Sequence, residues 1–358
     1  MKLRWLKYFF LVLIVLMLGA GIFIYKYAMA RLAPRPSMLD TPTSFIGFNH
    51  IGLSVLDLDK MLEFYETATD FEVIQRYTVE NNPAANALFG QDSISFEKAI
   101  LKGPNMLLEL TEFAEQSDSI VSRMPFQGPG MTHTCYQGPP ATSVYHKFKD
   151  AGADILSRGE GTVVVSSVSV SYAYGYDPEG NMMELEHMPD ILIPLNIGKD
   201  YAQKNPMWMT QVALMSPNLK RLAAFYEEVL EIEPYRVNSY GPSPILDAVV
   251  DYDSVMMDAV WFGMDTQGKK MEMMQYTHPI TPDIEKARKL TDLGYSFSFE
   301  VGDIQKEYER LKNKGVNFAS SPQKMQDFWM VFAQDPDGNI FSLRQIIDTN
   351  SPLSLMNM

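Results

Sequence analysis

Four side chains of this sequence, His50, Glu109, His133 and Glu184, are of types that hold metal ions. Imidazole and carboxylate groups together suit a divalent first-row metal, and four of them on an octahedral ion leave two positions for oxygen atoms of a substrate. A lone histidine in a strand is more often a packed or surface residue than a ligand. These residues can form a site only if the internal organisation of the chain brings them together.

The chain of 358 residues contains an internal repeat. A Phe-Tyr-Glu sequence at 64–66 returns at 225–227, and an Asp-Pro-x-Gly-Asn sequence at 177–181 returns at 335–339. Superposing the two copies places Gln211 on His50, Glu272 on Glu109, Tyr295 on His133 and Ser342 on Glu184. Gln211 and Glu272 could still bind a metal, whereas Tyr295 is a poor ligand and Ser342 lacks a carboxylate. A fold repeated twice is predicted, with a complete metal site in one copy only.

Four units of similar pattern must position these residues, each with one strand, one helix and three further strands. In the first unit, alternating apolar residues predict a strand over 48–55, and Asp57 or Asp59 can cap a helix over 58–69. At 177–180, proline fixes φ and glycine accepts a positive φ, which predicts a turn. The pattern indicates an α+β protein with domains at 44–190 and 206–347, a linker at 191–205 and a disordered tail at 348–358.

Residues 1–37 are predicted to form a membrane anchor and a tether. Residues 8–25 contain 18 consecutive uncharged side chains, whereas a membrane-spanning helix needs about 17–25 and the core of a signal peptide has about 7–15. The short basic segment before the span favours a body outside the cytoplasm. Ala28-Met29-Ala30 resembles a cleavage site, so secretion after signal cleavage is the alternative.

The charge balance bears on the partners of the protein. Residues 1–37 hold six of the 30 basic residues and no acidic one, which leaves 24 basic against 44 acidic residues in the remainder. A body this acidic repels phosphate backbones, so nucleic-acid binding is not expected. Cys135 is the only cysteine, which excludes an intrachain disulfide.

Several short motifs resemble the vicinal oxygen chelate superfamily, which includes glyoxalase I, methylmalonyl-CoA epimerase, extradiol dioxygenases and bleomycin resistance proteins. The motifs are His50-Ile-Gly-Leu-Ser-Val, Glu109-Leu-Thr, Gly130-Met-Thr-His133 and Asp177-Pro-Glu-Gly-Asn-Met-Met-Glu184-Leu. The resemblance implies that two units pair into a cup, with ligands on the first and last strands of each unit. For this chain it implies one divalent metal (Zn, Ni, Co, Mn or Fe) bound by His50, Glu109, His133 and Glu184. The second half is then a degenerate, metal-free domain.

The resemblance implies three kinds of function. The first is glyoxalase-like or epimerase-like proton transfer next to a metal-chelated carbonyl of a small molecule, as in a lyase or isomerase, with Glu184 and Glu109 as base and acid. The second is an extradiol-type Fe(II) dioxygenase using His50, His133 and Glu184 with Tyr174 nearby, although the histidine expected shortly before that tyrosine is absent. The third is a non-catalytic binding protein of the resistance type. Four units can pair within one chain, which predicts a monomer.

Overall fold

The computed structural model describes residues 38–115, 123–193, 207–265 and 268–358. The predicted membrane span at 8–25 lies outside these residues, as does most of the predicted linker at 191–205. Within the described ranges, no helix has the length and apolar character needed to cross a membrane.

The described elements follow the predicted order of four units, except that units one and three each contain a second helix and units two and four each contain one further short strand. Unit one contains β1 (Phe45–Val55), α2 (Leu58–Ala68), β2 (Glu72–Glu80), α3 (Pro83–Phe89), β3 (Ser95–Lys102) and β4 (Leu107–Phe113). Unit two contains β5 (Gly130–Gly138), α4 (Val144–Asp150), β6 (Asp154–Ile155), β7 (Val163–Val164), β8 (Ser171–Tyr176) and β9 (Met182–His187). Unit three contains β10 (Trp208–Met215), α7 (Leu219–Leu230), β11 (Arg236–Tyr240), α8 (Pro244–Val250), β12 (Met256–Gly263) and β13 (Lys270–His278). Unit four contains β14 (Gly294–Val301), α9 (Ile304–Asn313), β15 (Asn317–Phe318), β16 (Gln323–Lys324), β17 (Phe328–Gln334) and β18 (Ile340–Ile346).

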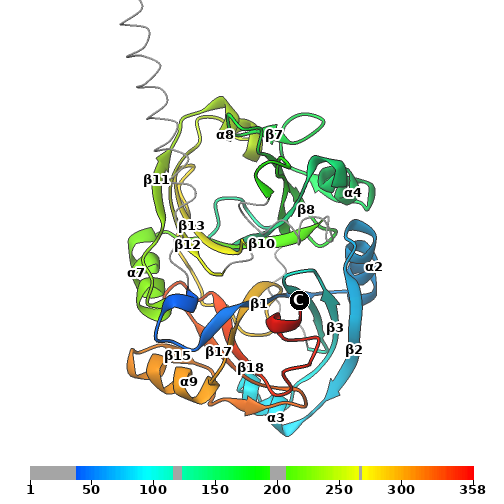
Figure 1. Ribbon diagram of the computed structural model, residues 1–358, viewed down its shortest axis with the longest axis vertical. Helices are drawn as coiled ribbons and strands as arrows, with labels where there is room; N and C mark the ends of the chain where they lie inside the picture. Colours follow the sequence, from blue (N-terminus) through cyan, green and yellow to red (C-terminus); the bar gives the residue numbers. More distant parts are fainter. Residues whose placement is uncertain (1–37, 116–122, 194–206, 266–267) are drawn as a thin grey trace, which may run out of the picture. The chain divides into compact units, whose positions relative to one another are not determined.

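The described strands form two nine-stranded sheets, and each sheet combines units from both halves of the chain (Figure 1). In sheet A, β1 of unit one pairs antiparallel with β14 of unit four. In sheet B, β5 of unit two pairs antiparallel with β10 of unit three. The α+β class and the repeated unit are confirmed. The prediction that units one and two build one domain is wrong, because the central strand pairs join one to four and two to three.

Alternation along the strands gives each sheet two different faces. In β1, Ile51, Leu53 and Val55 belong to the main hydrophobic core, whereas His50 and Gly52 lie on the opposite face. In β10 of sheet B, Val212 and Leu214 likewise belong to the core, whereas Gln211 and Ala213 lie on the opposite face. Both sheets curl, which gives each one a concave face (Figure 1). We call these concave faces cup A, for sheet A, and cup B, for sheet B.

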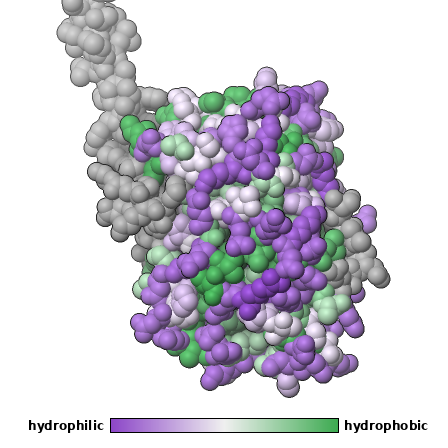
Figure 2. Space-filling model, turned by 90° about the vertical axis from the view of Figure 1, so that its right-hand side faces the viewer, coloured by the Kyte–Doolittle hydropathy of each residue, from purple (hydrophilic) through white to green (hydrophobic). Residues whose placement is uncertain are grey.

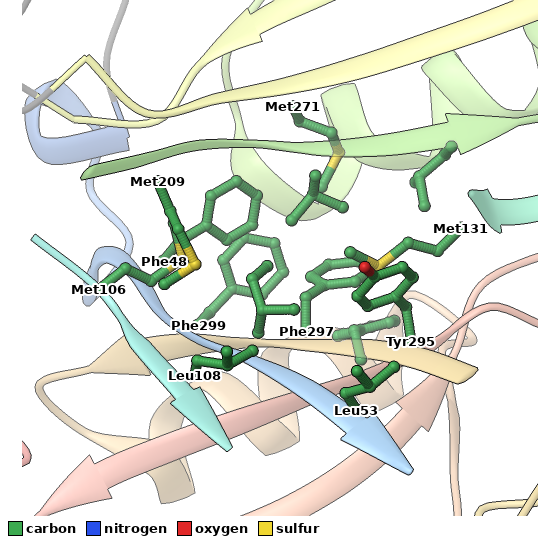
Figure 3. Packing of buried hydrophobic residues seen from close by; sticks show 14 of the residues in the cluster. Phe48, Leu53, Met106, Leu108, Met131, Met209, Met271, Tyr295, Phe297 and Phe299 are labelled. Atoms are coloured by element: carbon green, nitrogen blue, oxygen red, sulfur yellow. The ribbon is translucent and has the colours of Figure 1, made fainter. Parts of the chain in front are cut away.

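The outer faces of the two sheets share one hydrophobic core (Figure 3). Phe48, Phe297 and Phe299 of sheet A lie in this core with Met209 and Met271 of sheet B. Since a buried apolar side chain contributes roughly 1.5–3 kcal/mol, this core holds the sheets together.

Polar groups cross the same core. The ammonium group of Lys269 is buried and donates hydrogen bonds to the carbonyl oxygens of Phe48 at 2.9 Å and Asn105 at 2.8 Å. The Tyr295 hydroxyl donates to the carbonyl of Met182 at 3.0 Å, which ties unit four to unit two. Buried groups of this kind are satisfied only in one relative placement of the sheets.

Within each copy of the repeat, the Phe-Tyr-Glu helix contacts the Asp-Pro-x-Gly-Asn turn. The hydroxyl of Tyr65 in α2 donates to Oδ2 of Asp177 at 3.0 Å, and that of Tyr226 in α7 donates to Oδ2 of Asp335 at 3.0 Å. In the first turn, Asp177 Oδ1 also accepts the backbone N–H of residues 179 and 181, and Gly180 has the positive φ of 86° that the sequence predicts. The signatures therefore recur because each helix anchors the turn of the following unit.

The C-terminal residues are ordered, so the predicted disordered tail at 348–358 is wrong. Leu353 is fully buried among residues of cup A, and a short 3₁₀ helix, η3, spans Leu355–Asn357. Glu300 holds this segment by accepting the Ser354 hydroxyl at 2.7 Å and the Leu355 N–H at 2.8 Å. The tail therefore closes one side of cup A.

Figure 2 shows the side of the molecule on which α2 lies, and hydrophilic residues predominate there with hydrophobic ones between them. The solvent-facing positions of α2 include Asp59, Glu63 and Glu66, while its buried stripe includes Met61 and Tyr65. Part of the acidic excess counted from the sequence therefore lies on the exposed face of this helix.

Replacing Tyr65 by phenylalanine tests the helix-to-turn anchor. Tyr65→Phe leaves the buried Asp177 carboxylate without one donor, so we expect the free energy of unfolding to fall by about 1–3 kcal/mol. Tyr240→Phe is the control, because the Tyr240 hydroxyl bonds only to exposed Asn238 in the described chain. Urea denaturation followed by circular dichroism measures both, and equal losses in the two variants would contradict the anchor.

Candidate metal centre in one of two unequal cups

Cup B gathers four polar side chains from four strands. His133 and Gln211 lie on the central strands β5 and β10, and Glu184 and Glu272 lie on the neighbouring strands β9 and β13. In the parallel pairs, Cys135 stands opposite Glu184 and Ala213 opposite Glu272. Because side chains two residues apart share a face of a strand, each carboxylate lies on the same face as the histidine or glutamine beside it.

The four groups are close together and buried. His133 Nε2 lies 3.6 Å from Glu184 Oε2 and 3.3 Å from Gln211 Nε2. One ligand atom each from His133, Glu184 and Glu272 fall within 4.8 Å of one another. The exposed fraction is 0% for His133 and Gln211, 5% for Glu184 and 9% for Glu272, so bulk water does not separate these groups.

Neighbouring side chains orient the four groups. The imidazole Nδ1 of His133 lies 3.0 Å from the hydroxyl of Thr132, which leaves Nε2 as the nitrogen that faces the cup. The indole N–H of Trp261 donates to Oε1 of Glu272 at 2.6 Å. The ring of Tyr174 lies against His133, with centroids 4.9 Å apart.

Cup B has an excess of negative charge. Glu184, Glu186 and Glu272 carry three carboxylates, and Lys270 is the cation that interacts with all three. Burial raises the pKa of Glu272, and the Glu184 charge raises it further, while Lys270 opposes this. Burial also favours a raised pKa for Glu184, but the neighbouring His133 outweighs this effect and holds the pKa below its usual value. When ionised, the four groups sum to a formal charge of −2.

At the corresponding strand positions of cup A, the carboxylate is already paired with cationic side chains. His50 Nε2 lies 3.7 Å from Glu109 Oε2, but both oxygens of Glu109 are already engaged by cations. Arg344 Nη1 donates to Oε1 at 2.6 Å, and Lys98 Nζ donates to Oε2 at 2.7 Å. Glu109 and Arg344 are both fully buried, so this ion pair lies in the interior.

Electrostatics in cup A oppose cation binding. Burial lowers the pKa of His50 well below its usual value and the Arg344 charge lowers it further, so His50 is neutral near pH 7. Burial would raise the pKa of Glu109, but Arg344 above all holds it well below its usual value. The positive charges of Arg344 and Lys98 flank both oxygens of Glu109, and they repel a divalent cation at this carboxylate.

The predicted four-residue site is therefore not formed. The structure brings His133 and Glu184 together in cup B, and His50 with Glu109 in cup A, and the two pairs belong to different sheets. The reason is the pairing of the units, which gives His133 and Glu184 the partners Gln211 and Glu272. The sequence already indicated Gln211 and Glu272, because superposing the two copies of the repeat places them on His50 and Glu109.

One repeat equivalence needs correction. Cys135 pairs with Glu184 in sheet B, and Ser298 pairs with Ser342 in sheet A. His133 lies two residues before Cys135, and Ser296 lies two residues before Ser298. The counterpart of His133 is therefore Ser296 rather than Tyr295. Tyr295 instead lies in the main core.

The cysteine has a more ordinary role. Cys135 is buried, and its thiol contacts Oε2 of Glu186 at 3.5 Å. Burial, with the charges of Glu184 and Glu186, raises the pKa of this thiol well above its usual value. It is therefore protonated near pH 7.

Comparison with known proteins identifies the family. The model of the Glyoxalase/Bleomycin resistance protein/Dioxygenase superfamily matches residues 47–185 and 208–343. The chain belongs to this superfamily.

Individual relatives were found at both the sequence and the structure level. An uncharacterized Bacillus subtilis protein, YurT, is 35% identical over 82 residues, which cover 23% of this chain and 63% of YurT, less than two thirds of its length. Glyoxalase I from Zea mays has a TM-score of 0.56 and 19% identity over 84% of this chain and 92% of its own. A putative dioxygenase from Bacillus subtilis has a TM-score of 0.55 and 10% identity over 86% and 87%. At these identities, the two structures show a shared fold.

The different surroundings of Glu109 and Glu272 predict unequal responses to loss of either carboxylate in the metal-free protein. Glu109→Gln leaves Arg344 and Lys98 buried without their anion, and we expect a loss of about 3–5 kcal/mol in the free energy of unfolding. Glu272→Gln keeps the acceptor for Trp261 and removes a charge that its surroundings disfavour, so the expected change is below about 1 kcal/mol. Denaturation at pH 7 in a chelator measures both. A larger loss for Glu272→Gln than for Glu109→Gln would contradict this assignment.

Proposed function

We propose that this protein is an enzyme that binds one divalent metal in cup B through Gln211, Glu272, His133 and Glu184. The observation that carries the proposal is the convergence of these four buried groups from units two and three. The proposal replaces His50 and Glu109 of the sequence-based set by the residues that the fold places beside His133.

Two features of cup B fit a divalent cation. Gln211 Oε1 is buried and has no hydrogen-bond partner among the described residues, so its acceptor lone pairs are unused. The formal charge of −2 on Glu184, Glu186, Glu272 and Lys270 equals the charge that a divalent ion would neutralise. One imidazole, two carboxylates and one amide oxygen form a donor set suited to Zn, Ni, Co, Mn or Fe.

The proposed reaction is proton transfer at a carbon next to a carbonyl group of a small molecule. A bound divalent ion supplies Lewis-acid polarisation of that carbonyl. Glu272 Oε1 is engaged by Trp261, so Oε2 is the oxygen that would hold the ion and, when released from it, accept or return a proton. Glu184, on the strand across the cup, holds the second carboxylate needed for the opposite transfer. The aromatic rings of Tyr174 and Trp261 are buried beside them and limit access of water.

The donor set argues against the dioxygenase alternative. An extradiol-type site needs two histidines and one carboxylate, and the structure separates His50 from His133 into different cups. The position beside His133 is filled by Gln211 instead. Tyr174 does lie against His133, as the dioxygenase hypothesis expects, but packing alone does not supply the second imidazole.

Activity of isosteric variants tests the proposed reaction. In metal-loaded protein, with metal occupancy measured for each variant, Glu272→Gln and Glu184→Gln should each lower the rate about 10²–10⁴-fold. Glu66→Gln, an exposed charge on α2, is the matched control. Panels of 2-oxoaldehydes, acyl-CoA esters and catechols serve as substrates, with deuterium uptake from D₂O as the readout of proton transfer.

Two outcomes would contradict the proposal. Oxygen-dependent catechol cleavage that survives Glu272→Gln would support the dioxygenase alternative instead. Tight binding of panel compounds without turnover, in protein that carries metal, would favour a non-catalytic binding protein.

A further inference from the structure

Arg344 of cup A has a hydrogen-bonding edge that the protein does not use. Its side chain is fully buried, and Nη1 donates to Glu109 at 2.6 Å and to Asn49 Oδ1 at 3.1 Å. The other edge of the guanidinium, formed by Nε and Nη2, has no partner within the described chain, nor does the buried hydroxyl of Ser342. Ser342 and Arg344 lie two residues apart on β18 and share its cup-facing side.

A buried, unpaired guanidinium edge is costly. Burying a polar group without a hydrogen-bond partner destabilises the fold, and burying a charged group without one does so more strongly. The flat face of this guanidinium lies 4.2 Å from the ring centre of Phe328, which leaves the edge as the direction for a ligand. Two parallel N–H groups on one edge match the two oxygens of a carboxylate.

The groups left without a partner at this edge select an anion. Arg344 and Lys98 carry two positive charges, Glu109 and Glu300 carry two negative ones, and His50 is neutral, so the buried groups of the cup sum to zero. The oxygens of Glu300 are already engaged by Asn49, Ser354 and Leu355, so the unused groups are the donors of Arg344 and Ser342. An anionic acceptor fits these donors, whereas a cation would be repelled by the guanidinium. Cup B instead leaves an acceptor, Gln211 Oε1, without a partner among the described residues, so the two cups differ in ligand class.

The surroundings favour a small organic anion rather than a hydrated inorganic one. Phe328, Met330, Ile340 and Leu353 form one hydrophobic cluster in this cup. Asn49 joins the tail to the guanidinium, because its Nδ2 donates to the Leu353 carbonyl at 2.9 Å while its Oδ1 accepts from Arg344. A ligand at Arg344 is thus enclosed by the C-terminal segment.

We propose that cup A is a second, metal-free site that binds a small organic carboxylate through Nε and Nη2 of Arg344, with the Ser342 hydroxyl as an additional donor. This site is independent of the metal centre proposed for cup B. The duplicated fold then holds two sites in one chain that differ in the charge of their ligands.

Thermal unfolding and calorimetric titration with formate and acetate test the site, using full-length protein stripped of metal so that cup B offers no cation to the probe. We expect either carboxylate to raise the melting temperature in a saturable manner with one site per chain. Sodium chloride at equal ionic strength and acetamide, which has the shape of acetate without its charge, should have no such effect.

Three variants decide the location. Arg344→Gln should weaken acetate binding at least about a hundredfold, since two hydrogen bonds to a charged group are lost. Arg158→Gln, a surface arginine paired with Asp251 and Asp253, should bind as the wild type does. Ser342→Ala removes one uncharged donor and should weaken binding about tenfold. This variant provides the test if Arg344→Gln does not fold. Absence of a carboxylate response in the wild type, or unchanged affinity in Ser342→Ala or a folded Arg344→Gln, would overturn the proposal.

Discussion

The antiparallel pairing of β1 with β14 and of β5 with β10 is the constraint on which the rest of the structure depends. These contacts join the first unit to the last and the two middle units to each other. They bring His133 and Glu184 to Gln211 and Glu272, and they bring His50 and Glu109 to Arg344. Every later property of the two cups follows from which unit lies across the central strand pair, because each unit supplies only half of a cup.

A single strand position shows how one fold gives two kinds of site. Two residues beyond Glu184 in β9 stands Glu186, and two residues beyond Ser342 in β18 stands Arg344. The carboxylate of Glu186 adds to the negative charge of cup B. In cup A, the guanidinium of Arg344 pairs with Glu109 and excludes a divalent ion there.

Much of the fold could be predicted from local pattern. The alternation of β1, the Asp57-capped helix α2 and the turn at Gly180 are set by neighbours in sequence, and the structure confirms them. The partner of each unit could not be predicted, because all four units offer similar central strands and the choice depends on contacts between residues far apart in sequence. Thr134 and Gln211 are 77 residues apart, and Asn49 and Glu300 are 251 residues apart. The counterpart of His133, Ser296, is the neighbour of the predicted Tyr295, and only the pairing register of the strands identifies it. The role of Arg344 depends on its distance to Glu109, which is 235 residues away in sequence.

Metal binding by single-site variants of the full chain tests the central claim most directly. Titration with Co²⁺ or Mn²⁺ should give one site per chain in the wild type, and His50→Leu should retain it with little change in affinity. Gln211→Leu should weaken the same site, by about 10–100-fold or more for loss of one ligand or its support. Retained affinity in Gln211→Leu together with lost affinity in His50→Leu would contradict the crossed assembly of the metal site.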